Sequence, residues 1–235
     1  MLLNTKLRFF NIKFSLLTVL YSSLGIFFYN GIVEAEKTTF NGPVELSSQA
    51  FQELNINGPS TLHAIKADSL AVKGPLDFIK LKIKGKTEIS GPCRGEDGEF
   101  GDVVIHGPFE GTKIIAESLH VDGTVALEDF KIKGNVSING PLKAKVGSFQ
   151  DINTVNTPVA LYDVSVNNIN VKKDSGKISN DPVNNEGYGK NNEIKLAGKT
   201  IVSGNITFES GDGVVFIRDK TAQFKGKIIG GKIRE

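Results

Sequence analysis

Asn41-Gly42-Pro43 opens a sequence phrase that returns at a nearly constant interval along the chain. A polar residue followed by Gly-Pro recurs at 57, 73, 90, 106 and 139, and degenerate copies stand at Asp122-Gly123-Thr124 and Asn156-Thr157-Pro158. Neighbouring copies begin 16 or 17 residues apart. A period of this kind is typical of a solenoid, in which each repeat is one coil stacked on the next. The repeats that begin at 41, 57, 73, 90, 106, 122, 139 and 156 are coils 1 to 8.

Apolar residues occupy three pairs of positions in each coil. With the residue before glycine counted as position 0, the pairs fall at 3 and 5, at 8 and 10, and near 13 and 15. In coil 3 they are Leu76 and Phe78, Leu81 and Ile83, and Thr87 and Ile89. Residues two apart on a strand project to the same side. The pattern therefore predicts three short strands with inward pairs and three corners per coil.

The fold class expected from this pattern is all-β, a single-stranded parallel β-solenoid (triangular β-helix) with about eight coils of 16–17 residues. Helical repeats are disfavoured, because a Gly-Pro every 16 residues would interrupt the helices. In coil 7 the last inward pair is expected to be Ile152 and Val155. Thr124 and Thr157 are expected to weaken the corners at which they replace proline and glycine.

Residues 1–35 read as a secretory signal peptide. Lys6, Arg8 and Lys13 precede an apolar run at 14–29, and Val33-Glu34-Ala35 resembles a small-residue cleavage site. Cleavage after Ala35 would place the protein outside the cell, in the periplasm or on the cell surface. An uncleaved segment that anchors the chain in a membrane is the alternative.

Beyond the signal, the sequence suggests three parts. Residues 36–171 form the repeat domain, 172–192 are a polar linker or insertion, and 193–235 form a C-terminal β cap or irregular coils. A hairpin closed by the turn at 210–213 is an alternative for this last part. A solenoid end exposes unpaired backbone groups, which is the reason to expect a cap.

Charge and cysteine content exclude some classes of function and of fold. Residues 1–35 contain three of the 28 basic and one of the 26 acidic residues, so the rest of the chain is formally neutral. Nucleic-acid binding needs clustered cations and is not expected. The single cysteine, Cys93, cannot pair within the chain and falls at an inward position, so stability must come from packing and backbone hydrogen bonds.

The densest polar cluster lies in coil 4, where the inward residues are replaced by Gly95 and Gly98. Its members are Arg94, Glu96, Asp97, Glu99 and Asp102. Glu96, Asp97, Glu99 and Asp102 are candidate calcium ligands, since carboxylates near flexible glycines suit that ion. Their spacing matches no calcium-binding loop motif, so a bulging solvated loop is the alternative.

Neither the histidines nor any familiar catalytic motif in the sequence indicates an enzyme. His63 falls on coil 2, and His106 and His120 fall at the two ends of coil 5, mostly at outward positions and with no shared ligand spacing. The chain has no Gly-x-Ser-x-Gly elbow, Walker loop or paired-cysteine motif. We therefore expect no catalytic residues, no cofactor and no nucleic-acid partner.

Over residues 41–171, the short coils, inward Ile, Val and Leu pairs and Gly-containing corners resemble bactofilins, the polymer-forming cytoskeletal β-solenoids of bacteria. The resemblance is architectural, and it implies a small solenoid that polymerises end to end as a scaffold.

The expected function is that of an exported structural or surface-interaction protein, scaffold-like or adhesin-like, without catalytic activity. Its expected partners are further copies of itself, packed end to end or face to face, and a cell-surface or polysaccharide ligand. A β-helix enzyme acting on carbohydrates, or a polysaccharide-binding protein, using the acidic coil 4 is the alternative.

Overall fold

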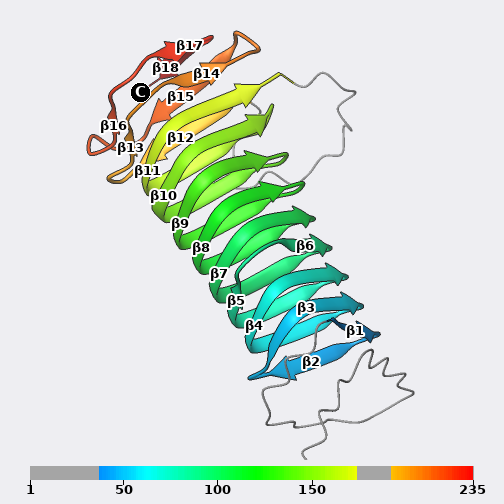
Figure 1. The fold of residues 1–235 in the computed structure, drawn as a ribbon. Coiled ribbons are helices and arrows are strands. Elements are labelled where there is room, and N and C mark those ends of the chain that lie inside the picture. The colour runs from blue at the N-terminus through cyan, green and yellow to red at the C-terminus, as the bar shows by residue number, and fades with distance from the viewer. Residues whose placement is uncertain (1–36, 174–191, 235) are drawn as a thin grey trace, which may run out of the picture.

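The structure, a computed structural model, describes residues 37–173 and 192–234, and these form an all-β parallel β-solenoid of about 11 turns without a helix (Figure 1). The predicted signal peptide at 1–35 lies outside the described residues, and so does most of the predicted linker at 172–192. Within the described ranges, no helix has the length and apolarity needed to cross a membrane.

The strands follow the predicted repeat. The first part of the chain contains β1 (Thr38–Asn41), β2 (Val44–Ser47), β3 (Ala50–Asn57), β4 (Ser60–Lys73), β5 (Leu76–Ile83) and β6 (Thr87–Ser90). From coil 4 to coil 8 each coil is one strand that bends at its corners: β7 (Cys93–His106), β8 (Phe109–Val121), β9 (Val125–Ile138), β10 (Leu142–Val155) and β11 (Val159–Lys172).

The C-terminal part continues the solenoid. Its strands are β12 (Glu193–Ala197), β13 (Ile201–Val202), β14 (Ile206–Phe208), β15 (Gly213–Ile217), β16 (Gln223–Phe224), β17 (Ile228–Ile229) and β18 (Gly231–Arg234). β12 to β14 form coil 9, β15 to β17 form coil 10, and β18 begins coil 11. Because β15 pairs in parallel with β12 and β18, the hairpin alternative is wrong, and the estimate of about eight coils was too low.

Equal positions of neighbouring coils lie above one another. β8 pairs with β9 so that Phe109 is opposite Val125 and Ile114 is opposite Phe130. Coil 6 has one extra residue, which lies between Ile132 and Val136 on β9, where the register against Ala116 and Leu119 of β8 shifts by one. At about 4.8 Å per coil, the rod is about 50 Å long.

The inward positions form one continuous apolar core along the rod. One of the predicted inward residues was wrong: Thr154, not Val155, is buried in register with Ile138 and Val171. The hydroxyls of Thr154 and Thr87 are buried without a hydrogen-bond partner. A threonine at these sites fills nearly the volume of the valine that the pattern expects, which explains why the coil tolerates it.

Coil 4 does not bulge. Gly95 and Gly98 lie on the regular strand β7, and they leave room for the rings of Phe78 and Phe100, whose centroids are 5.5 Å apart in an edge-to-face arrangement. A Cβ at Gly95 would lie 2.5 Å from the ring of Phe78. The two glycines therefore complete the core, whereas the sequence suggested that they thin it.

The Gly-Pro corner depends on a close approach of backbones. Gly107 has φ 152°, and a Cβ there would lie 2.6 Å from the carbonyl oxygen of Gly91, one coil below. The proline carbonyl also continues the ladder, because it accepts a hydrogen bond from the first inward residue of the preceding coil, as from Leu76 to Pro92. Thr124 accepts the equivalent bond from Phe109 at 2.8 Å, so the ladder continues through this corner, which was expected to be weakened.

The next corner is made by one residue in the left-handed conformation at position 7 of every coil from 1 to 8. These residues have φ between 49° and 61° and are Ser48, Ala64, Lys80, Asp97, Lys113, Asp129, Val146 and Asp163. In coil 9, Gly198 occupies the same place with φ 60°. The conformation is strained for residues other than glycine and most of all for the β-branched Val146.

Replacing Gly107 by alanine should destabilise the protein by about 2–3 kcal/mol, because the methyl group forces two coils apart at the corner. The control is Gly42→Ala, since Gly42 also has a positive φ of 94° but no atom within 4 Å of an added Cβ. Thermal unfolding measures the difference, expected as a melting temperature lower by about 4–8 °C for Gly107→Ala. Equal losses in both variants would contradict the stacking explanation.

Replacing Val146 by asparagine should stabilise the protein by about 1 kcal/mol. Val146 is 49% exposed, so little packing is lost, while asparagine adopts the left-handed conformation more easily. The measurement is a melting temperature raised by about 2–4 °C. Val155→Asn, on ordinary β backbone, serves as the control and should give no such gain.

Candidate functional site

The four candidate calcium ligands of coil 4 are not brought together. Asp97 makes a corner of the coil, and Glu96 lies just before it. Glu96 belongs to the first face of the rod, which is the outward surface formed by positions 4 and 6 of the coils. Glu99 lies on the second face, which holds positions 9 and 11, and Asp102 lies beyond it at the following corner. Carboxylates that lie around such a corner cannot surround one ion.

Three of these carboxylates instead have partners in adjacent coils. Glu96 accepts from the ammonium of Lys113 at 2.7 Å, and Glu99 accepts from Lys82 at 2.6 Å. Asp102 accepts from the hydroxyl of Ser118. The hydrogen bond from Lys113 also lowers the pKa of Glu96. In the described part of the chain, no group of three or more His, Cys, Asp or Glu residues could hold a metal ion.

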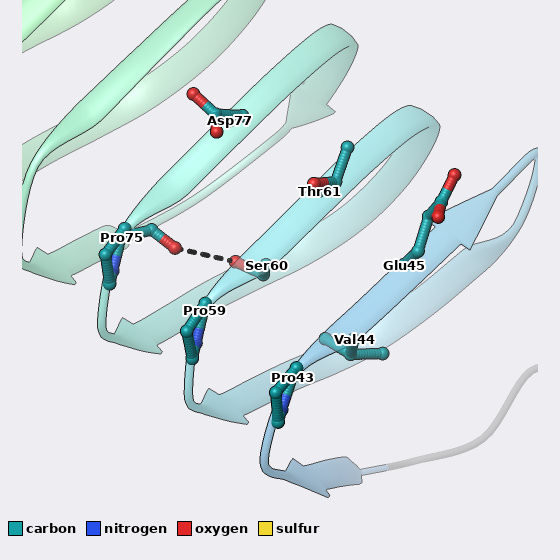
Figure 2. A pocket seen from close by; sticks show the side chains of 8 residues that line it. All are labelled: Pro43, Val44, Glu45, Pro59, Ser60, Thr61, Pro75 and Asp77. Carbon is teal, nitrogen blue, oxygen red and sulfur yellow. Dashed lines mark hydrogen bonds between the residues drawn. The ribbon is translucent and has the colours of Figure 1, made fainter. Parts of the chain in front are cut away.

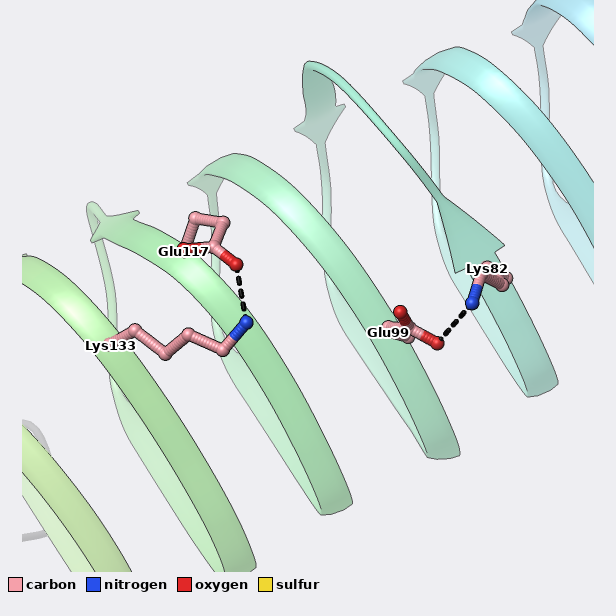
Figure 3. A network of polar contacts seen from close by, with 4 residues as sticks. All are labelled: Lys82, Glu99, Glu117 and Lys133. Atoms are coloured by element: carbon pink, nitrogen blue, oxygen red, sulfur yellow. Dashed lines mark hydrogen bonds and ion pairs between the residues drawn. The ribbon is translucent and has the colours of Figure 1, made fainter.

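Ion pairs on the surface run mainly along the rod, from one coil to the next. Figure 3 shows two of them on neighbouring parts of the surface, Lys82 with Glu99 and Lys133 with Glu117. The others between adjacent coils are Lys37 with Glu53, Lys84 with Asp68, Arg94 with Glu110 and Lys113 with Glu96. Such exposed pairs contribute little stability each. Their effect is to neutralise the surface along its length.

Two of the histidines meet at one carboxylate, which the sequence spacing did not suggest. His106 Nδ1 lies 2.8 Å from Asp122 Oδ2, and His120 Nε2 lies 3.3 Å from Oδ1. Asn139 donates to the same Oδ1 at 2.6 Å. The 16-residue register places His106 over Asp122, and His120 precedes Asp122 by two residues, so applying the coil register to polar residues would have found the cluster.

The Asp122 carboxylate is partly withdrawn from water. Burial raises its pKa, but hydrogen bonds from Asn139 and His106 and the charges of the two imidazoles outweigh this effect. The pKa of Asp122 therefore lies below its ordinary value of 3.8. The site holds a charged carboxylate between two histidines, which is a stable polar contact between coils 5, 6 and 7.

Stacked asparagines make side-chain contacts between coils. Asn57 donates to Asn41, at the same position of the preceding coil, at 2.8 Å. Asn139 donates to Asp122, so its side chain points toward coil 6. A further amide contact joins Asn170 to Asn153 at 3.2 Å.

Surface hollows are shallow. Figure 2 shows one of about 370 Å³ along the first corner of coils 1 to 3, where stacked prolines border the outward side chains of Glu45, Thr61 and Asp77. Ser60 Oγ donates to the carbonyl of Pro75 at its edge, at 3.4 Å. A second depression, of about 360 Å³, lies on the first face of coils 4 to 7.

Cys93 is buried at its predicted inward position, with 3% of its surface exposed. Burial raises the pKa of its thiol far above the ordinary value. The thiolate that a nucleophile needs is therefore suppressed, and Cys93 serves as a small core residue.

The two ends of the rod leave the core partly open. The apolar residues that pack against the core while staying only partly buried lie in the first coils or in coil 10, and they are Phe40, Val44, Phe51, Ala222, Phe224 and Ile228. Ile229 and Ile233 at the C-terminal end are 49% and 47% exposed. In the described part of the chain, β16, β17 and β18 each pair with one strand only, as do β1 and β2.

Comparisons of the chain with protein-family models, with curated proteins and with solved structures found no match. The parallel pairing of about 11 turns establishes the β-solenoid architecture. The features from which a function can be argued are therefore the surfaces and ends described above.

Replacing Asp122 by asparagine should lower the melting temperature near pH 6 by no more than about 4 °C, because the contact is more than a third exposed. A depressed pKa in the folded state means that the stabilisation is complete above about pH 3.8 and is lost as the pH falls through the folded pKa. The difference from wild type should therefore shrink below pH 3.8. Asp129→Asn is the matched control, and a difference that persists unchanged at about pH 2 would contradict the assignment.

Proposed function

We propose that the protein is an exported, non-catalytic structural element that assembles end to end into longer rods. The observation that supports this most is the open core at both ends, where Phe40, Phe51, Phe224 and Ile228 are only partly buried. Stacking the C-terminal end of one copy on the N-terminal end of the next would cover these side chains. It would also pair strand edges that have one neighbour within the described residues.

The ends are compatible because both present the same triangular section. The N-terminal end offers β1, β2 and the start of β3, and the C-terminal end offers β16, β17 and β18. Head-to-tail contacts of this kind are heterologous and generate an open filament when the rotation does not close. The resemblance to bactofilins supports the same mode of assembly.

Export is the second part of the proposal and rests on residues 1–35. A basic start, a short apolar run and a small-residue site are the features of a signal peptide. The protein would then serve outside the cytoplasm, on the cell surface or in the periplasm, where a stiff rod can act as a spacer or scaffold.

The alternative of a carbohydrate-active enzyme has less support. Glycoside hydrolysis needs two carboxylates that face one substrate bond. In coil 4, Glu96 and Glu99 lie on either side of a corner, and each is paired with a lysine. Release of reducing sugars from a panel of acidic polysaccharides would favour the enzyme over the scaffold.

End-to-end assembly can be tested with Phe224→Lys/Ile228→Lys, which places two charges on the open C-terminal core. Wild-type protein, expressed from the full sequence and purified after export, should form species that lengthen with concentration up to about 100 µM, as measured by sedimentation velocity and electron microscopy. The variant should lose this growth, because each new interface would bury two ammonium groups.

The matched control is Ile115→Lys/Val146→Lys, which introduces the same charges at exposed apolar residues on the side of the rod. It should assemble like wild type. Wild-type protein that shows no end-to-end growth at about 100 µM, or two variants that behave alike, would refute the proposal.

A further inference from the structure

The first face of the solenoid is divided into an acidic and a basic half. In coils 1 to 6 its outward residues include five carboxylates and one cation, which are Glu45, Asp77, Glu96, Glu110, Glu128 and Arg94. In coils 7 to 11 the charged residues at positions 4 and 6 are all cations, namely Lys143, Lys145, Lys195, Arg218 and Arg234, while Glu193 lies on the same side of β12 at its start. The other charged contacts of the rod neutralise each other coil by coil, so this separation is a distinct feature.

Many of these charges have no ion-pair partner within the described residues. Glu96 and Glu110 are paired with Lys113 and Arg94. Glu45, Asp77 and Glu128 have no such partner in the described ranges, and the same is true of the five cations. Arg218 instead stacks on Phe216, with its guanidinium 5.0 Å from the ring centre.

We infer that the first face is the contact surface for a second copy of this chain, packed side by side and antiparallel. A two-fold axis that lies in the contact plane, parallel to the strands and beside coil 6, sets coil 7 against coil 5, coil 9 against coil 3 and coil 11 against coil 1. This places the acidic half of each copy on the basic half of the other. The parallel arrangement would instead set like charges against each other.

The register brings opposite charges together at equal positions. Lys143 faces Glu110 of the second copy, Lys195 faces Asp77, and Arg234 faces Glu45. By symmetry each contact occurs twice. Ala126 and Glu128 of coil 6 lie at the axis, so each faces its own counterpart. The small side chain of Ala126 allows the two surfaces to approach, and Glu128 makes the one like-charge contact of this arrangement.

The shape of the face agrees with this placement. The depression of about 360 Å³ spans coils 4 to 7 and includes Gly111 and Ala126, so it lies around the proposed axis. Tyr162 of coil 8, whose side chain is 48% exposed, would face coil 4 beside Gly95 at the edge of the depression. Ile79, 50% exposed, would lie against Ala197 of the second copy.

The area is sufficient for a specific dimer. A face about 50 Å long and about 13 Å wide offers about 650 Å² per copy, or about 1,300 Å² in total. Stable complexes begin at about 1,200 Å². A long polyanion is a poorer fit, because it would meet five carboxylates along the same face.

The pairing deepens the proposed function, since it names a lateral contact between the rods, and it can be measured separately from end-to-end growth. All variants are therefore made in the Phe224→Lys/Ile228→Lys background, in which only the lateral contact remains. Sedimentation velocity should show a dimer that dissociates as the salt concentration rises to about 0.5 M.

A charge swap provides the decisive experiment. Lys143→Glu/Lys195→Glu alone and Asp77→Lys/Glu110→Lys alone should each weaken dimerisation at least about tenfold, because each sets like charges face to face. A 1:1 mixture of the two variants should restore the dimer, since every swapped residue then meets an opposite charge. Lys66→Glu/Lys131→Glu, on the second face, is the matched control and should dimerise normally.

The inference is overturned if the background protein stays monomeric at about 100 µM, or if the mixed variants do not associate. Binding of polyglutamate to a monomer through Lys143 and Lys195 would also overturn it. If the background protein stays monomeric while wild-type protein still grows end to end, the lateral contact alone is rejected. If the background protein dimerises while wild-type protein shows no end-to-end growth, the proposed end-to-end assembly alone is rejected.

Discussion

The constraint on which the whole structure depends is the stacking of equal positions in successive coils. Backbone hydrogen bonds run from each coil to the next, and at the Gly-Pro corner they bring the backbones so close that Gly107 has no room for a side chain above Gly91. A repeat of 16 or 17 residues keeps this register, and in coil 6 the seventeenth residue is absorbed where the pairing of β9 with β8 shifts by one. The period seen in the sequence is thus the number of residues in one turn of the solenoid.

Stacking also determines how the core is filled. Because a side chain lies directly above its counterpart, a large ring in one coil can be accommodated by a small residue in the next. Phe78 lies under Gly95, and Phe130 lies under Gly147 in the same way, with its ring again next to the missing side chain. In these two columns the ring fills the space that the glycine leaves. Glycine at an inward position is therefore part of the packing.

The sequence predicted the fold class and most inward residues, since hydrophobic periodicity reports burial directly. It could not reveal the left-handed corner at position 7, because residues as different as Ser48, Lys80 and Val146 adopt it. Beyond residue 192 the shorter strands obscured the repeat, so a β cap and irregular coils were both expected there. The proximity of His106, His120 and Asp122 was missed because the register was not applied to the histidines and their acidic neighbours. The calcium hypothesis treated closeness in sequence as closeness in space, although a corner separates Glu96 from Glu99.

The same stacking shapes what the surface can do. Groups that neighbouring coils place one above another tend to pair with each other, as Lys82 does with Glu99, and so they are less available to a ligand. Two features stay available: the open core at the two ends and the charges of the first face that have no ion-pair partner within the described residues. Our proposals match both features with another copy of the same chain, because an identical rod repeats the spacing of the coils and carries the complementary half of the charges. A regular solenoid with these two features is therefore suited to building an assembly.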